Sequence, residues 1–252
     1  MGLSRSSKRY QPTDKEADLA LEKRLTELAS RWKRFGYRRL HMMLQREGVH
    51  VNIKRTYRLY RSAGLTLKKK RKKKCLEKRG RPHPVPREIN ARWSMDFVSD
   101  KTANGNRLKI LTLMDEATRE CLALEVDTSL TGKRVCGVLN RVGWFRAFPR
   151  ELLTDNGPEF TGNALNGWCF DRRVDHLFID PGRPSQNGLI ESFNGKLRDE
   201  CLNQHWFKNL SEARRIIEAW RVEYNNSRPH TALGGLTPKE YAILLESEDG
   251  SA

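Results

Sequence analysis

The sequence has few cysteines, no long apolar run and no nucleotide-binding loop. Its five cysteines are odd in number and never closely paired, which argues against a disulfide framework and a cysteine-based zinc site. No stretch approaches the roughly 18 apolar residues of a membrane span, and the first 21 residues contain no apolar core of a secretory signal. The absence of a GxxxxGK[ST] motif argues against ATP use. We therefore expect a reduced, cytoplasmic protein without membrane contact.

Acidic residues are nearly absent from positions 31–87. This block carries 21 basic residues and only 2 acidic ones, whereas residues 88–252 carry 21 basic and 24 acidic residues. The block therefore accounts for the formal net charge of +17. A basic segment joined to a slightly acidic region indicates that one part of the chain binds a polyanion and the other acts on it.

Two short helices are predicted within the basic block. Apolar residues at 37, 40, 43 and 44 recur at helical spacing, and Gly48 ends that helix. Asn52 can cap a second helix, from Ile53 to Ala63. Its apolar positions are Ile53, Tyr57, Tyr60 and Ala63, and its candidate DNA-binding cations are Lys54, Arg55, Arg58 and Arg61. An earlier helix, roughly 14–34, is expected to pack on this pair.

The two short helices are typical of a helix-turn-helix, although an ordinary helical hairpin with solvated charges fits the same pattern. Seven consecutive cations then precede a proline series at 82, 84 and 86. This run is expected to contact DNA phosphates without reading sequence, and the alternative is a merely solvated run. Its members are Lys68, Lys69, Lys70, Arg71, Lys72, Lys73 and Lys74. We predict a helical DNA-binding region over 1–67 and a basic, proline-containing linker over 68–90.

From position 91 the chain alternates between strand and helix patterns. Strands are expected at 93–98, 108–114, 121–126, 151–154 and 174–179, and helices at 131–148, 161–173, 185–204 and 211–225. The Asn104-Gly105-Asn106 sequence predicts a hairpin turn after the first strand. This order predicts an α/β fold with a mixed sheet and helices on both faces. We predict that residues 91–210 form this core and that residues 211–252 form a C-terminal helical tail.

Some side chains in this region have simpler expected places. Four tryptophans are expected to anchor the core: Trp144, Trp168, Trp206 and Trp220. Two carboxylate pairs, Asp115-Glu116 and Asp199-Glu200, lie beside predicted element ends and are expected on the surface.

Three carboxylates stand where a site could be built. Asp96 lies in the first strand, Asp155 follows the strand at 151–154, and Glu191 lies on the helix predicted at 185–204. Each taken alone fits a surface or turn residue. The Glu191 helix is more informative, because an apolar stripe borders a polar face. The stripe holds Ile190, Phe193, Leu197 and Cys201, and the polar face holds Asn187, Glu191, Asn194 and Arg198.

The segments around these carboxylates closely resemble the catalytic core of retroviral-integrase-like DDE transposases. Thirty-five residues separate Asp155 from Glu191, which is the spacing typical of that core. Further downstream, residues 224–230 and 236–238 resemble insertion-sequence transposases made from two overlapping frames, specifically the downstream-frame product called OrfB. The matching motifs are Trp93-x-x-Asp96, Thr154-Asp155-Asn156-Gly157-x-Glu159-Phe160, Asn187-x-x-x-Glu191-Ser192-Phe193-Asn194, Tyr224-Asn225-x-x-Arg228-Pro229-His230 and Leu236-Thr237-Pro238.

The resemblance implies an RNase H-like fold with a mixed five-stranded sheet, behind an all-α helix-turn-helix region. It implies that Asp96, Asp155 and Glu191 hold two Mg²⁺ or Mn²⁺ ions and catalyse cleavage of transposon ends and transfer of the 3′-OH to another phosphodiester. By analogy Arg198 contacts DNA near this site, although many relatives have Lys there. Further DNA contacts are expected at Lys196, Asn156, Asn187 and Asn194.

The expected partners are double-stranded DNA, other copies of this chain on that DNA, and the upstream-frame product OrfA or a fusion to it. No long heptad pattern supplies a coiled coil here. Two alternatives stay open: an RNase H-like nuclease that only hydrolyses, and a DNA-binding regulator of transposition that is inactive without its upstream-frame partner. A bacterial protein in the cytoplasm, associated with the nucleoid, is expected.

Overall fold

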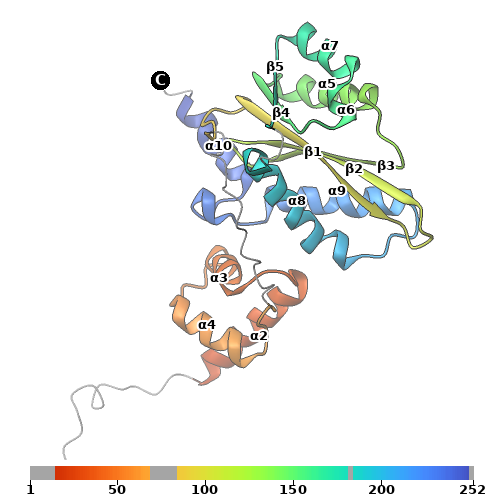
Figure 1. The fold of residues 1–252 in the computed structure, drawn as a ribbon. Coiled ribbons are helices and arrows are strands. Elements are labelled where there is room, and N and C mark those ends of the chain that lie inside the picture. Colours follow the sequence, from red (N-terminus) through yellow and green to blue (C-terminus); the bar gives the residue numbers. More distant parts are fainter. Residues whose placement is uncertain (1–14, 69–83, 181–183, 250–252) are drawn as a thin grey trace, which may run out of the picture. The chain divides into compact units, whose positions relative to one another are not determined.

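The computed structural model describes residues 15–68, 84–180 and 184–249 (Figure 1). The described residues before and after the gap at 69–83 form two separate compact units. Of the predicted phosphate-binding run, Lys68 is described and exposed, and residues 69–74 lie outside the described part.

The described residues of the first unit, 15–68, form three helices, as the sequence predicts. They are α2 (Lys15–Arg31), α3 (Tyr37–Arg46) and α4 (Ile53–Ser62). The Asn52 side chain caps α4 by accepting a hydrogen bond from the Lys54 backbone N–H at 2.8 Å. Gly48 ends the turn after α3 with a φ of +79°, a conformation that favours glycine. Buried side chains from all three helices form one core, including Leu25, Leu40, Leu44, Leu59 and Tyr60.

The predicted apolar face of α4 is partly wrong. Thr56, Leu59 and Tyr60 are buried, whereas Ile53 and Tyr57 are each 42% exposed. The reason is a polar contact inside the unit, because buried His41 of α3 forms a 3.0 Å hydrogen bond with the Thr56 hydroxyl. That contact turns the Thr56 side of α4 towards α3.

The second unit is built on a mixed five-stranded sheet, which confirms the predicted fold class. Its strands are β1 (Arg92–Lys101), β2 (Arg107–Asp115), β3 (Cys121–Asp127), β4 (Glu151–Thr154) and β5 (Asp175–Phe178). The order in the sheet is β3-β2-β1-β4-β5. Strand β2 is antiparallel to both β1 and β3, whereas β4 is parallel to both β1 and β5. Strand β1 is therefore central, between the antiparallel and the parallel part of the sheet.

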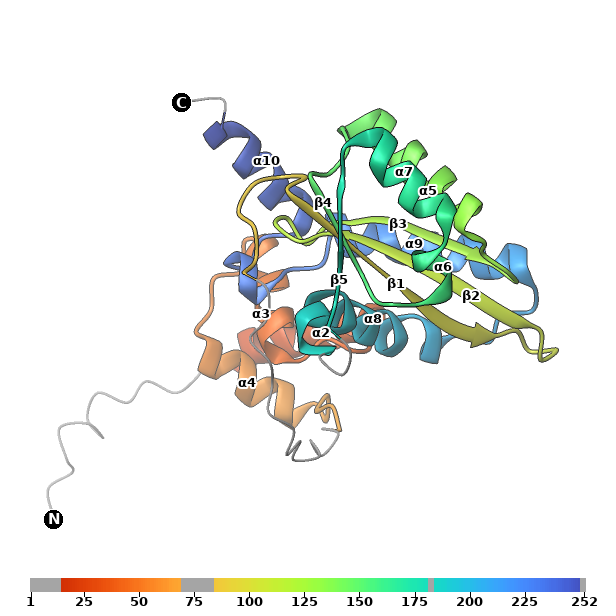
Figure 2. The same ribbon diagram turned by 45° about the horizontal axis from the view of Figure 1, so that its top comes forward.

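Helices cover both faces of this sheet (Figures 1 and 2). One face packs α5 (Gly132–Arg146) and α7 (Asn163–Arg172) against Trp93 and Met95 of β1. The other packs α8 (Gly188–Glu200) and α9 (Leu210–Asn226) against Val98 of β1 and its neighbours. Because side chains alternate along a strand, Asp96 faces the same side as Val98, towards α8. Helix α10 (Pro238–Asp249) packs against α9.

Two predicted helices have different bounds in the structure. The helix expected over 161–173 is α7, which begins only at Asn163 because the extended Gly162 separates it from the short helix α6 (Pro158–Thr161), which was not predicted. The helix expected over 185–204 is α8 flanked by the 3-10 turns Pro184–Asn187 and Leu202–Gln204. Within the described ranges, no helix is long and apolar enough to cross a membrane.

Several burial predictions were wrong. Trp144 and Trp206 are 80% and 84% exposed, so they do not anchor the core. Asp115 and Glu116, expected on the surface, are buried, because the Asp115 carboxylate accepts the backbone N–H groups of Ala117 and Thr118 in the turn after β2.

Glu200 was also expected on the surface. Its side chain is only 10% exposed and forms an ion pair with Arg228, which follows α9.

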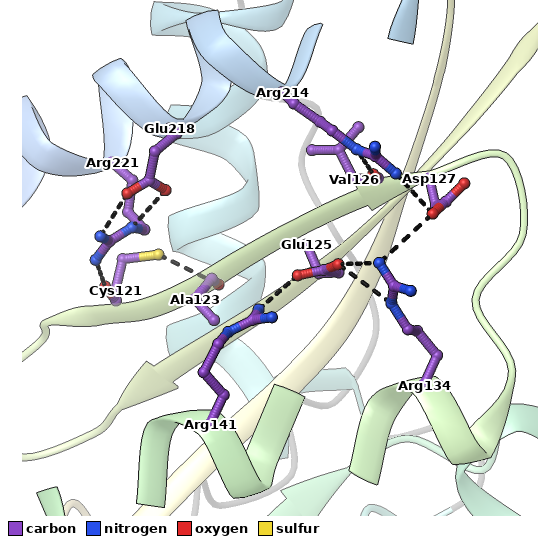
Figure 3. A network of polar contacts seen from close by, with 10 residues as sticks. All are labelled: Cys121, Ala123, Glu125, Val126, Asp127, Arg134, Arg141, Arg214, Glu218 and Arg221. Atoms are coloured by element: carbon purple, nitrogen blue, oxygen red, sulfur yellow. Dashed lines mark hydrogen bonds and ion pairs between the residues drawn. The ribbon is translucent and has the colours of Figure 1, made fainter. Parts of the chain in front are cut away.

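The outer strand β3 is flanked by arginines from helices on both faces (Figure 3). Arg134 and Arg141 of α5 hold the Glu125 carboxylate at 2.8 and 2.6 Å. Burial opposes ionisation of Glu125, but the hydrogen bonds from these two arginines outweigh it and hold its pKa below the ordinary value. This carboxylate is fully paired.

Polar side chains of α9 also bind the backbone of β3. Arg214 donates to the Val126 carbonyl at 2.8 Å, and Arg221 donates to the Cys121 carbonyl at 3.1 Å (Figure 3). Asn225 accepts the Cys121 N–H and donates to its carbonyl, both at 2.9 Å. These contacts satisfy backbone groups on an edge strand, where unpaired groups would otherwise attract another strand.

Candidate active site

The strand register brings the two aspartates to the same level of the sheet. Strands β1 and β4 pair in parallel up to Ser94 and Leu153. Asp96 and Asp155 each lie two residues beyond those positions. Adjacent parallel strands keep residues at equal register side by side, so the two carboxylates are neighbours although the sequence separates them widely.

Asp96 is held by two donors. Its Oδ1 accepts the Phe97 backbone N–H at 2.7 Å, and its Oδ2 accepts the Asn194 side-chain N–H of α8 at 2.7 Å. Burial raises the pKa of Asp96, and the nearby charge of Asp155 adds to that rise. The fold therefore fixes this carboxylate but does not neutralise it.

Asp155 is shaped by the turn that follows β4. Its Oδ1 accepts the Gly157 backbone N–H at 3.0 Å. A Cβ atom at Gly157 would lie 3.0 Å from the same carboxylate oxygen, so the turn fits closely around it. Two further contacts fix the turn: the Phe160 ring stacks on Phe97 at 4.9 Å between centroids, and Glu159 pairs with Lys109 of β2.

Glu191 lies in the first turn of α8, where the positive end of the helix dipole favours a carboxylate. Its side of the helix is the exposed one, whereas Ile190, Phe193 and Leu197 are fully buried on the other. Burial of its carboxyl group raises the pKa of Glu191, and the charge of Asp96 raises it further. The predicted apolar stripe of this helix is therefore confirmed, and Glu191 is close enough to Asp96 for electrostatic interaction.

Asp96 interacts electrostatically with both Asp155 and Glu191, but the three carboxylates do not form a closed ligand set. Among the residues that the structure describes, no three His, Cys, Asp or Glu side chains gather closely enough to hold a metal ion. The donor chemistry nevertheless fits a hard divalent cation, because Asp96, Asp155 and Glu191 offer only carboxylate oxygens. The nearest strand histidine, His176, is already bound by Thr154 and Asn166.

The other residues predicted to contact DNA differ in burial and in hydrogen bonding. Arg198 is exposed and donates to the Ser99 carbonyl at 3.3 Å, while the Asn156 side chain donates to the Ile179 carbonyl at 2.9 Å. Lys196 is half-buried. Asn187 and Asn194 are 3% and 7% exposed, and each has a buried Oδ1 without a hydrogen-bond partner among the described residues.

The predicted DNA-binding cations of α4 are not equivalent. Arg55 and Arg58 bind the Asp18 carboxylate of α2 at 2.7 and 2.6 Å, and these bonds lower the pKa of Asp18. Lys54 and Arg61 are exposed on the same helix. Two of the four predicted cations thus also join α4 to α2.

The ion pair between Lys109 and Glu159 was not predicted, although Glu159 belongs to the motif after β4. Lys109 lies above the Phe97 ring, with its Nζ 4.2 Å from the ring centroid, and pairs with Glu159. The signal was a single charged residue inside the otherwise uncharged segment 108–114, which a strand covered by helices tolerates only with a partner.

Family comparisons agree with this architecture. A profile described as Integrase core domain matches residues 86–184, a second profile with the same description matches 172–238, and one described as HTH-like domain matches 16–74. The insertion element IS407 uncharacterized 31.7 kDa protein of Burkholderia multivorans is 47% identical over 242 residues, which cover 96% of this chain and 87% of that protein. The insertion element IS476 uncharacterized 39.2 kDa protein of Xanthomonas euvesicatoria is 46% identical, covering 99% and 72%.

Similarity to solved structures concerns the fold of this chain, and similarity in sequence shows its family. A chain of the simian T-cell lymphotropic virus intasome in complex with PP2A regulatory subunit B56 gamma is similar over 86% of this chain and 74% of its own length, with a TM-score of 0.57 at 16% identity, which is a likeness of fold alone. The putative transposase InsK for insertion sequence element IS150 of Escherichia coli is 27% identical, covering 90% and 84%. The chain belongs to the bacterial insertion-sequence transposases with an HTH-like region and an integrase core. This family acts in DNA transposition and integration.

Proposed function

We propose that this chain is the transposase subunit that cleaves the ends of its element and joins the exposed 3′-OH to another DNA phosphodiester, with Asp96, Asp155 and Glu191 as catalytic residues. The observation that supports the proposal is that Asp96 of β1 lies near both Asp155 of the β4 turn and Glu191 of α8. Burial first, and then the charge of a neighbouring carboxylate, raises the pKa of Asp96 and of Glu191.

The proposed site takes two Mg²⁺ or Mn²⁺ ions. Three oxygen donors on rigid elements support this assignment, and the HTLV-2 integrase catalytic core domain, a fold relative with a TM-score of 0.51 and 18% identity, was solved in complex with magnesium. When bound, such ions activate the attacking oxygen and stabilise the leaving oxygen of the phosphodiester.

The chain's own residues orient the proposed catalytic carboxylates and provide a contact for the DNA. Asn194 fixes the orientation of Asp96, and the Gly157 N–H fixes that of Asp155. Arg198 lies seven residues after Glu191, which is about two turns along α8 on the same side. Its guanidinium has five N–H donors and uses one on Ser99, so it has donors left for a phosphate at the site.

DNA affinity is assigned to the first unit and to the lysine-rich run that follows it. The net excess of cations over 31–87 and the exposed Lys54 and Arg61 of α4 support duplex binding by this region. We further propose that the chain acts in the bacterial cytoplasm, on the nucleoid, as an oligomer on DNA, together with or fused to its upstream-frame product.

The test is a cleavage and joining assay on labelled duplexes that carry the terminal repeats flanking the gene, with and without the upstream-frame product. Mg²⁺ or Mn²⁺ should give both a cleaved end and a joined product, and Ca²⁺ should support binding only. Cleavage without joining would identify a nuclease that only hydrolyses. Binding without either product, in both arms, would identify a regulator. Full activity in EDTA would contradict the metal-dependent mechanism.

A further inference from the structure

The segment 224–230, which spans the end of α9 and the residues after it, has no role in the reaction described above. Its Arg228 side chain is 3% exposed and binds the Glu200 carboxylate through two donors, Nε at 2.8 Å and Nη2 at 2.6 Å. Glu200 is the last residue of α8, the helix that carries Glu191. A buried, two-point ion pair therefore ties the end of this helix to the segment after α9.

Aromatic contacts surround the same ion pair. The Tyr224 ring packs edge-on against Phe193 of α8 at 5.0 Å between centroids, and the Arg228 guanidinium lies 5.5 Å from the Tyr224 ring. His230 packs edge-on against Tyr224 at 4.9 Å, and its Nε2 lies 3.4 Å from Arg228 Nη1. The guanidinium therefore contacts a carboxylate, a tyrosine ring and a histidine nitrogen, which together restrain its orientation.

Helix α8 is thus held at two points, its middle and its last residue. Glu200 lies nine residues after Glu191, which corresponds to about two and a half turns and about 13 Å along the helix. Because two and a half turns separate the two residues, Glu200 lies on the side of α8 opposite Glu191, away from Asp96 of β1. At the middle of α8, Asn194 binds Asp96, and at its last residue, Arg228 binds Glu200. A rigid helix held at two such points has its tilt determined.

We propose that Arg228 is a positioning residue, which acts through Glu200 to set the tilt of α8 and thereby the place of Glu191 beside Asp96. The inference rests on the proposed function, because it assigns Glu191 a catalytic place. A buried ion pair contributes little net stability compared with an apolar pair of similar size. The ion pair is therefore better explained by the single geometry that it imposes than by stability.

The test is the single-turnover rate of joining a pre-cleaved end by Arg228→Lys, which keeps the charge but loses the two-point contact. We expect the rate to fall about tenfold or more, since small displacements of a catalytic group are costly. Duplex affinity should stay within about twofold, because residues 31–87 carry it. Amide hydrogen exchange in peptides from 188–200 should accelerate, and exchange in α5 should not change.

Two variants separate positioning from stability. The exchange variant Glu200→Arg with Arg228→Glu reverses the pair and should recover most of the lost rate. The double variant Glu200→Met with Arg228→Met replaces the pair by apolar side chains, which keeps the fold even if single variants unfold, and should remain slow. Arg150→Lys, which alters an exposed ion pair with Glu88, is the matched control and should join ends at the parental rate.

The outcomes distinguish this inference from the proposed function. Joining by Asp96→Asn at the parental rate would refute the proposed function. An inactive Asp96→Asn variant alongside parental rates for Arg228→Lys and the double methionine variant would refute only the role of Arg228. The inference would also be overturned if the joining rate of Arg228→Lys fell only in proportion to its folded fraction while the folded double methionine variant joined ends at the parental rate.

Discussion

Carboxylates of the integrase-core sheet occur in two opposite environments, at the outer strand β3 and at the central strand β1. On β3, two arginines bind Glu125, and its pKa is lowered (Figure 3). On β1, Asp96 has neutral donors and a neighbouring aspartate, and its pKa is raised, first by burial. Both carboxylates sit on strands covered by helices, so burial alone does not explain the difference.

The two environments differ in how the carboxylate charge is compensated. Around Glu125 the chain itself supplies the compensating cations, so this network needs no ligand. Around Asp96 it supplies two N–H donors, and the charge of Asp155 raises the pKa more than the charge of Arg198 lowers it, so a ligand of positive charge would balance the site. The difference supports the proposal that paired carboxylates such as Glu125 serve stability and that Asp96 and Glu191 serve the reaction.

The largest expected effect comes from Asp96→Asn. It removes the charge but keeps the size, and both hydrolysis and joining should fall by about three orders of magnitude or more while duplex affinity is unchanged. A normal rate on either substrate would remove Asp96 from the site.

The same variant tests the sign of the pKa shift. Because the pKa of Asp96 is raised in the folded state, its contribution to stability is present at low pH and is lost as pH rises through that raised value. In metal-free buffer Asp96→Asn should match the parent at low pH and equal or exceed its stability at neutral pH. Chemical denaturation at both pH values measures this difference, and a variant less stable only at neutral pH would contradict the assignment.

A smaller effect is expected from Gly157→Ala. The glycine has an ordinary φ of −61°, so alanine causes no backbone strain, but its Cβ would lie 3.0 Å from the Asp155 carboxylate. The rate of joining should fall about tenfold through displacement of that carboxylate, with unfolding free energy within about 0.5 kcal/mol of the parent. Gly167→Ala on α7, where a Cβ meets open space, is the control. Equal rates for the two variants would mean that the turn does not constrain Asp155.

The smallest effect on activity is expected from Glu125→Gln. Stability should fall by about 1 to 2 kcal/mol, a modest cost because Arg134 and Arg141 are half-exposed and solvent screens them. Since the pKa of Glu125 is lowered, this loss should be present above the ordinary carboxyl pKa and disappear as pH falls through the lowered value. The joining rate of the folded variant should stay within about twofold. A loss of joining as large as that of Asp96→Asn would end the distinction between the two environments.

Much of the fold could be predicted because local patterns and tertiary packing agree. The β4 bounds and the α3 and α4 starts match the sequence pattern, since caps and apolar periodicity are local signals. The apolar stripe of α8 was predicted for the same reason. The carboxylate positions followed from motifs, and the register of β1 and β4 explains why residues so distant in sequence meet.

Other features depended on contacts that no local pattern reveals. Trp144 and Trp206 are exposed although large aromatics usually anchor cores. Glu200 is enclosed because Arg228, 28 residues later, reaches it, and Thr56 is buried because His41 binds it. Each of these outcomes depends on a partner on another element, which periodicity within one helix cannot predict.

The central claim is that the unpaired carboxylates perform the reaction, and Glu191→Gln tests it most directly. The measurement is joining of a pre-cleaved end in Mg²⁺ under single-turnover conditions, with duplex affinity measured on the same preparation. Glutamine keeps the helix preference and the size of Glu191 while removing its charge. The account predicts no joined product above the protein-free background and unchanged affinity. Joining within about tenfold of the parental rate would contradict it.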